Sequence, residues 1–192
     1  MRIFKAPLLF LCVLALLVGI AQYDEWKTSK EKNESEKRNR LFIFEEDEVI
    51  SLSYENYSEN KSIPISIKLE KIKDDWFIDY PVKEKANQRV IKDIIDTLRK
   101  YKFQKIITGD KLVMEDFGLN FPVIRIRLIG KNLYELNLGS KSPVGYGIYL
   151  MKGSDNNVYL GSQFILTALT KTLSDFKEKK EEIPNLADPE PK

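Results

Sequence analysis

The 192-residue chain is 43% hydrophobic, which is enough for one globular domain once the apolar N-terminal segment and the polar tails are set aside. Its 31 basic residues stand against 29 acidic ones, and since Arg2 and Lys5 precede the apolar segment, the remainder is neutral and predicts no nucleic-acid partner. Histidine is absent, and the single cysteine, Cys12, lies within the apolar segment. These features exclude histidine-dependent triads, histidine-ligated zinc and disulfide frameworks, and we expect neither a cofactor nor a metal ion.

The first 23 residues are typical of a membrane-targeting segment, because two basic residues precede an uninterrupted apolar run from residue 6 to residue 21. We favour a retained transmembrane anchor, although the small residues Gly19 and Ala21 also fit a cleaved signal peptide. Either fate places the body outside the cytoplasm, as a single-pass membrane protein or as a periplasmic one. We therefore expect an anchor or signal at 1–23, a charged stalk at 24–40, an extracytoplasmic domain at 41–177 and a disordered tail at 178–192.

The first half of the body is organised around Trp76 and the helix that follows it. Apolar and alternating runs predict strands at 41–44, 49–54, 63–72 and 76–80, with an acidic turn at 45–48. Pro81 ends the last of these strands, and apolar residues at helical spacing predict an amphipathic helix over 83–101. We expect Trp76 to be a core anchor, since a large aromatic side chain at a hairpin more often packs than binds a ligand.

The second half repeats the order of strands followed by a helix. Strands are predicted at 103–107, 123–129, 133–138, 146–151 and 158–160, a helical turn at 112–117, and a helix over 162–176. The fold class is thus α+β, with antiparallel β-meanders each followed by an amphipathic helix and an added N-terminal membrane helix. Trp76 and Tyr159 take corresponding places, and this recurrence suggests two repeated β-β-β-α units.

The loop after Gly139 is the candidate contact site for a partner or ligand. It lacks the residue spacing of a phosphate-binding loop, and adjacent Ser and Lys residues seldom face each other as a nucleophile and its base. The loop is polar, bounded by glycine and followed by an aromatic residue, as contact loops often are. The candidate residues are Ser140, Lys141, Ser142 and Tyr146. The alternative is an ordinary solvated connection between two strands.

A series of fold landmarks carries a family resemblance. They are Trp76-x-Ile78-x-x-Pro81, Phe117-Gly118-Leu119-x-x-Pro122, Leu138-Gly139, Tyr149, Val158-Tyr159 and Asp175-Phe176. In this order, from about residue 41 to residue 176, they resemble the bacterial family of domain of unknown function 4340. The resemblance implies a membrane-anchored envelope protein, in some members associated with transporter systems of the gliding-motility type, and it implies no activity. Lys177 stands where an arginine commonly follows the Asp-Phe pair.

These observations predict a non-enzymatic, membrane-anchored extracytoplasmic module that binds or scaffolds envelope or transporter proteins. One alternative is an envelope hydrolase, which would need two converging carboxylates, at least one with a perturbed pKa. A further alternative is a lipid- or small-molecule-binding protein, which would need an apolar pocket between sheet and helix.

Overall fold

The computed structural model describes residues 19, 22–23, 26–27, 39–57, 63–109, 111–153, 155 and 157–178. The predicted membrane segment at 1–23, the stalk at 24–40 and the tail at 178–192 lie almost entirely outside these residues. Among the described residues, no helix is both long enough and apolar enough to span a bilayer. The chain divides into two compact units, Met1–Arg40 and Leu41–Lys192, and the fold below is that of the second unit.

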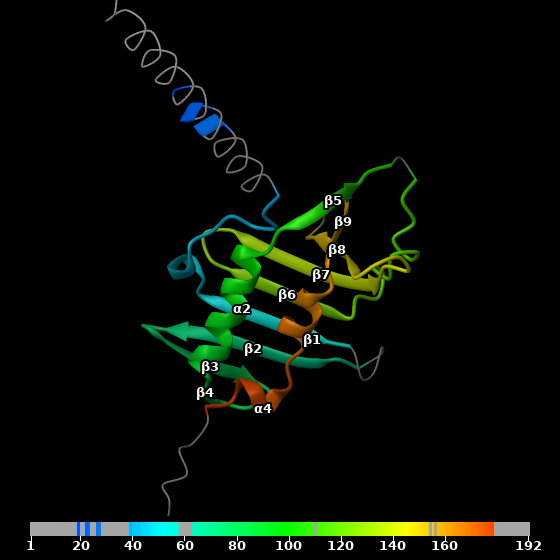
Figure 1. The fold of residues 1–192 in the computed structure, drawn as a ribbon. Coiled ribbons are helices and arrows are strands. Elements are labelled where there is room, and N and C mark those ends of the chain that lie inside the picture. Colours follow the sequence, from blue (N-terminus) through cyan, green and yellow to red (C-terminus); the bar gives the residue numbers. More distant parts are fainter. Residues whose placement is uncertain are drawn as a thin grey trace, which may run out of the picture. The chain divides into compact units, whose positions relative to one another are not determined.

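Nine strands of the described residues form one sheet in the order β4-β3-β2-β1-β6-β7-β8-β9-β5, shown in Figure 1. The strands are β1 (Ser51–Asn56), β2 (Ile65–Ile72), β3 (Asp75–Tyr80), β4 (Glu84–Lys85), β5 (Phe103–Ile107), β6 (Ile124–Ile129), β7 (Leu133–Lys141), β8 (Gly147–Lys152) and β9 (Val158–Ser162). Each neighbouring pair in this order is antiparallel. The two runs β1–β4 and β6–β9 meet where β1 pairs with β6, so the fold is α+β and mostly antiparallel sheet.

In the part of the chain that the structure describes, three α-helices lie on one face of this sheet, and Figure 1 shows α2 and α4 on the same side of it. They are α2 (Gln88–Lys100), α3 (Phe164–Leu169) and α4 (Leu173–Phe176). The helix α2 buries Ile91, Ile94, Ile95 and Leu98, which belong to the same core as the inward side chains of the strands. Trp76 is 7% exposed and is part of that core, as predicted.

The predicted start of the first helix at residue 83 is wrong. Glu84 and Lys85 instead form the short strand β4 on β3, and the helix begins only at Gln88. The side chain of Asn87 accepts a hydrogen bond from the backbone N–H of Val90 and so caps the helix at this point. The helical spacing of the apolar residues from residue 90 onward identified the helix correctly. The residues assigned to its first turn belong instead to the edge strand of the sheet.

The predicted strand at 41–44 is also wrong. This stretch crosses the helical side as irregular chain, with the N–H of Leu41 donating to the carbonyl of Tyr101 at 2.9 Å. Leu41, Phe42 and Phe44 are buried because they pack on the core, while Ile43 is 71% exposed, and the acidic turn after this stretch is the 3-10 helix η1 (Glu46–Glu48). Burial rather than strand pairing accounts for the apolar run.

The predicted helix over 162–176 is interrupted between α3 and α4. The hydroxyl of Tyr54, from β1, donates to the carbonyl of Leu169 at 2.9 Å and accepts from the N–H of Lys171 at 2.9 Å. The backbone groups that would continue the helix are therefore occupied by a side chain from the sheet. Thr172 and Asp175 form a capping box that starts α4.

We call the side of the sheet away from the helices the open face. On β8, Ile148 and Leu150 belong to the core, so Tyr149 points to the open face. The turns of residues 111–121 cover this part of it, since the Phe117 ring lies 4.9 Å from that of Tyr149 and Leu119 is buried.

Candidate functional site

The centre of the open face carries a charged network of five side chains from β1, β6 and β7. Arg125 donates from Nη1 to Glu55 Oε2 and from Nε to Asn137 Oδ1, both at 3.0 Å. Arg127 Nε donates to Glu135 Oε2 at 2.8 Å, and Asn137 Nδ2 donates to Glu135 Oε1 at 3.2 Å. The strand register produces this arrangement, because it places Arg125 between Glu55 and Asn137 and Arg127 beside Glu135.

Pairing sets the electrostatics of the charged network. Partial burial acts to raise the pKa of Glu135, but the hydrogen bonds from Arg127 and Asn137 outweigh it, so that pKa is lowered. The hydrogen bond to Glu135 raises the pKa of Arg127. Burial, followed by the hydrogen bond to Glu55, raises the pKa of the Tyr57 hydroxyl. All these shifts favour the ionised pairs and the neutral phenol at ordinary pH.

This arrangement does not resemble a carboxylate-based catalytic centre. A general acid needs a carboxyl group whose pKa is raised toward the working pH, whereas that of Glu135 is lowered. Within the described parts of the chain, there is also no group of three or more Asp, Glu, His or Cys side chains that could hold a metal ion. The hydrogen bonds within the charged network hold its side chains in fixed orientations, so the network presents fixed charges, as a binding surface does.

One end of the open face carries exposed apolar side chains, which we call the apolar row: Ile72, Ile129 and Leu133. They are 56%, 45% and 63% exposed. Ile129 pairs directly with Leu133 across β6 and β7, while Ile72 ends β2 at the same end of the sheet. These residues share the face of Glu70 and Arg127, since they alternate with buried core residues.

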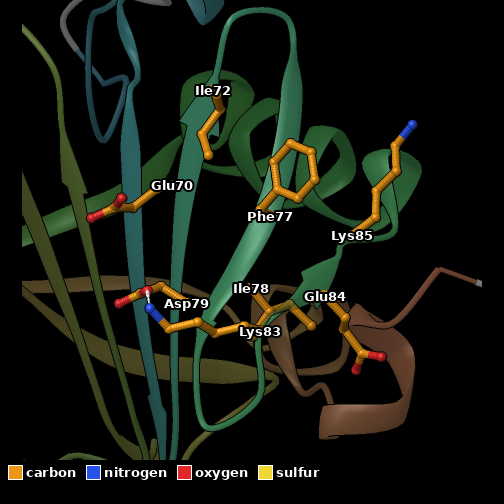
Figure 2. A pocket seen from close by; sticks show the side chains of 8 residues that line it. All are labelled: Glu70, Ile72, Phe77, Ile78, Asp79, Lys83, Glu84 and Lys85. Atoms are coloured by element: carbon orange, nitrogen blue, oxygen red, sulfur yellow. Dashed lines mark ion pairs between the residues drawn. The ribbon is translucent and has the colours of Figure 1, made fainter.

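Beside Ile72 the open face is hollowed over a volume of about 380 Å³, next to Phe77 on β3 (Figure 2). Glu70 and Asp79 border this hollow, and Lys83 reaches Asp79 at 3.3 Å. The Glu70 carboxylate has no hydrogen-bond or ion-pair partner among the described residues, although its backbone belongs to β2. The hollow thus combines an aromatic wall, an exposed isoleucine and an uncompensated carboxylate.

The structure separates the four residues predicted as the contact loop. Ser140 and Lys141 are the last residues of β7, and the N–H of Ser140 donates to the carbonyl of Phe117 at 2.8 Å. Ser142 lies in the loop, where its hydroxyl accepts from the N–H of Val144 at 3.3 Å. Tyr146 is 80% exposed at the end of the loop. Ser142 and Tyr146 therefore belong to an accessible loop, while Ser140 is part of the sheet's hydrogen bonding.

Sequence reasoning missed the charged network and the hollow. The alternation of Arg125 and Arg127 with apolar residues was visible, but Glu55 lies 70 residues earlier, and only the pairing of β1 with β6 brings it to Arg125. For Phe77 the sequence carried no comparable signal, because the hollow arises where the two-residue strand β4 leaves the edge of the sheet incompletely covered.

A model of a protein family described as a domain of unknown function (DUF4340) matches residues 76–188, more than half of the chain. The chain belongs to the DUF4340 family. This confirms the resemblance read from the sequence landmarks, although the matched region starts at Trp76 and leaves out β1 and β2. No curated protein and no solved structure matches the chain. Membership in the DUF4340 family therefore specifies no activity, and function must be argued from the site.

Proposed function

We propose that this DUF4340 protein is a non-enzymatic binding or scaffolding module, anchored in the cell membrane by its N-terminal segment, with its domain outside the cytoplasm. Its partner is a protein of the envelope, and the module serves as an accessory to a transporter complex. The observation that supports binding is the hollow beside Phe77, which adjoins the exposed Ile72 on the face opposite the described helices. The sequence of the first 23 residues supports the anchor.

The hollow and the apolar row supply the parts that protein interfaces use. Interfaces place an apolar or aromatic anchor in a pocket and surround it with polar groups that exclude water. Here Phe77 and Ile72 offer the apolar wall, and the charged network lies toward the centre of the same face. A partner side chain that enters the hollow would be shielded from water by Lys83 and Asp79 at the rim.

Charge indicates the chemistry of the partner. Three carboxylates line the hollow. Asp79 is paired with Lys83 and Glu84 with Lys177, so Glu70 is the group left to attract a cation. We expect the partner to present an apolar side chain flanked by a lysine or arginine. The lowered pKa of Glu135 supports binding over hydrolysis by carboxylates.

A small-molecule ligand is the second candidate, because the hollow has the volume of a small-ligand site, for which roughly 300–1,000 Å³ is usual. The hollow opens on the face away from α2, however, and not between sheet and helix, where a buried lipid or cofactor would be enclosed. This openness favours a protein side chain over an enclosed ligand.

The test is photo-crosslinking in membranes that contain the full chain. A photoreactive residue replaces Ile72 or Leu133, and the matched control replaces Ile106, which is 41% exposed on the far edge strand β5. We expect one defined protein adduct from positions 72 and 133, none from position 106, and loss of the adduct when Glu70→Lys is added. Adducts that are absent, or that are the same from all three positions, would reject this function.

We also propose that the two meanders are repeats of one unit. The edge strand β5, which follows α2, pairs with β9, while Lys177, which follows α4, bridges Ala86 next to β4. The chain that leaves α2, after the first meander, thus adds a strand to the second meander. The chain that leaves α4, after the second meander, in turn adds a bridge next to the first. Counted from the central β1–β6 pair, Trp76 is on the third strand and Tyr159 on the fourth, so the correspondence lies in strand order and not in these two residues.

A further inference from the structure

Three apolar side chains stand almost fully exposed where β7 turns into β8 and where α3 begins. We call Val144, Tyr146 and Phe164 the apolar tip; they are 82%, 80% and 78% exposed. They are neighbours, because the N–H of Gln163 donates to the carbonyl of Tyr146 at 2.9 Å. Single exposed apolar residues are common on proteins, but a group of large ones marks a surface that contacts something else.

The backbone of the apolar tip is held in place by its own hydrogen bonds. The N–H of Ser142 donates to the carbonyl of Gly147 at 2.9 Å, and Gly147 pairs with Ser162 on β9. The N–H of Val144 is bonded to the Ser142 hydroxyl at 3.3 Å. Polar backbone groups that already have partners can enter a region poor in water at lower cost than unpaired ones.

Charge is scarce in the three chain segments that surround the apolar tip. The segments 117–124, 139–151 and 158–170 meet here, since the N–H of Ser140 donates to the carbonyl of Phe117 and β8 pairs with β9. Together they carry one charged side chain, Lys141, although 31% of the whole chain is charged. Charge is therefore depleted from these three segments, and the chain that pairs with β9 adds only the basic side chains Lys102 and Lys105 beside them.

We propose that the apolar tip is a lipid-binding surface that enters the headgroup region of a bilayer, independently of the N-terminal segment. Side chains that project outward can insert between lipid headgroups, because lipid molecules rearrange around an inserted group. The concave hollow beside Phe77, in contrast, has the shape to accept a protein side chain. An aromatic residue with a polar hydroxyl, such as Tyr146, prefers the membrane interface, and Lys141 can reach lipid phosphates.

The point where the chain enters the domain lies near this surface. The N–H of Leu41 donates to the carbonyl of Tyr101, and the hydroxyl of Tyr101 donates to the carbonyl of Ser162 at 2.7 Å. Ser162 directly precedes the N-terminal end of α3, where Phe164 lies. A tether that arrives at Leu41 would therefore deliver the domain with the apolar tip close to its attachment point.

The experiment places a nitroxide probe on the full chain in vesicles of phosphatidylethanolamine and phosphatidylglycerol. In a Cys12→Ser background, Val144→Cys or Phe164→Cys carries the probe. The matched control is Ile50→Cys, which is 56% exposed at the opposite end of the sheet, where its N–H donates to the carbonyl of Ile129. We expect probes at 144 and 164 to become accessible to oxygen and protected from a water-soluble nickel chelate, while the probe at 50 stays in water. Adding Tyr146→Ser should reduce the protection at 144.

Probes at 144 and 164 that stay as accessible to the chelate as the probe at 50 would overturn the proposal. Protection that appears only when native membrane proteins are added would also overturn it, because the occupant would then be a protein. Since pure lipid vesicles hold no protein partner, the result is independent of the crosslinking test of the hollow.

Discussion

The hydroxyl of Tyr54 links the central strand β1 to the break between α3 and α4, and Tyr54→Phe tests how much this link contributes. The hydroxyl contacts three backbone groups: the carbonyls of Leu169 at 2.9 Å and Lys171 at 3.1 Å, and the N–H of Lys171 at 2.9 Å. Phenylalanine keeps the ring, so packing against Phe176 is preserved. A buried N–H left without a partner costs roughly 1–3 kcal/mol. We therefore expect a loss of about 2 kcal/mol in the free energy of unfolding.

Urea unfolding of the full chain in detergent, followed by the fluorescence of the buried Trp76, measures this loss. The midpoint should fall with an unchanged denaturant slope, and the melting temperature should drop by roughly 4–8 °C for a domain of this size. Tyr146→Phe is the matched control, because its hydroxyl is exposed, and we expect a change within about 0.5 kcal/mol. Equal effects of the two substitutions would refute the role assigned to the Tyr54 hydroxyl.

Alkaline pH provides a second test of the same contact. Burial raises the pKa of Tyr54 from 10.0 to about 12. A group whose pKa is higher in the folded state contributes stability that is present below its unfolded pKa and lost as pH rises toward the folded value. The wild type should therefore lose stability between pH 10 and 12, and Tyr54→Phe should lose less. Burial also raises the pKa of Tyr101 and Tyr159, so the variant keeps part of the slope.

Three further outcomes follow from the remaining contacts. Glu135→Gln should lower the free energy of unfolding by about 1–2 kcal/mol at neutral pH. Because the pKa of Glu135 is lowered from 4.5 in the folded state, the stability that its carboxylate contributes is lost as pH falls through the folded value. The urea midpoints of wild type and variant should therefore converge in acid, and midpoints that stay apart would contradict this. Gly118 and Gly145 both have a positive φ, +67 and +72, but a Cβ at Gly118 would meet the Ser140 hydroxyl, whereas a Cβ at Gly145 would meet open space. Gly145→Ala should cost about 1 kcal/mol, and Gly118→Ala should lower the melting temperature well beyond that. Equal losses would show that no clash occurs at Gly118. Lys177→Ala breaks a 2.8 Å ion pair with Glu84, and both side chains of this pair are about 40% exposed. Calorimetry should therefore show that the free energy of unfolding falls by no more than about 0.5 kcal/mol. A larger fall would contradict the weak contribution expected of an exposed ion pair.

Local periodicity explains which elements the sequence could predict. The strands β2, β6 and β7 alternate because one of their faces lies on the core, and α2 carries its apolar residues at helical spacing for the same reason. The break between α3 and α4 has no such local cause. It depends on the Tyr54 hydroxyl, which lies 117 residues before Lys171 and occupies the backbone groups there.

The candidate sites show the same limit. Tyr146 was recognised because it follows a polar, glycine-bounded loop, but its neighbour Phe164 fell inside the helix predicted over 162–176 and was not singled out. The helix begins at Phe164 itself, and at this first position the side chain points outward. The hollow beside Phe77 needs the order of the edge strands, which no local pattern contains.

The edges of the sheet decide how a partner can approach the hollow. At the β4 edge, Lys177 bridges Ala86, and the N–H of Glu178 donates to the carbonyl of Lys85 at 3.3 Å. The C-terminal end of the domain therefore occupies backbone groups to which an incoming strand would otherwise bind. Strand addition at this edge is blocked, while the face beside Phe77 stays accessible. A partner that approaches from this edge must therefore be recognised through side chains and not by adding a strand. Substitutions at Glu70 and Ile72 consequently distinguish the two modes of binding, because they should weaken binding by the open face and leave strand addition at the edge unchanged.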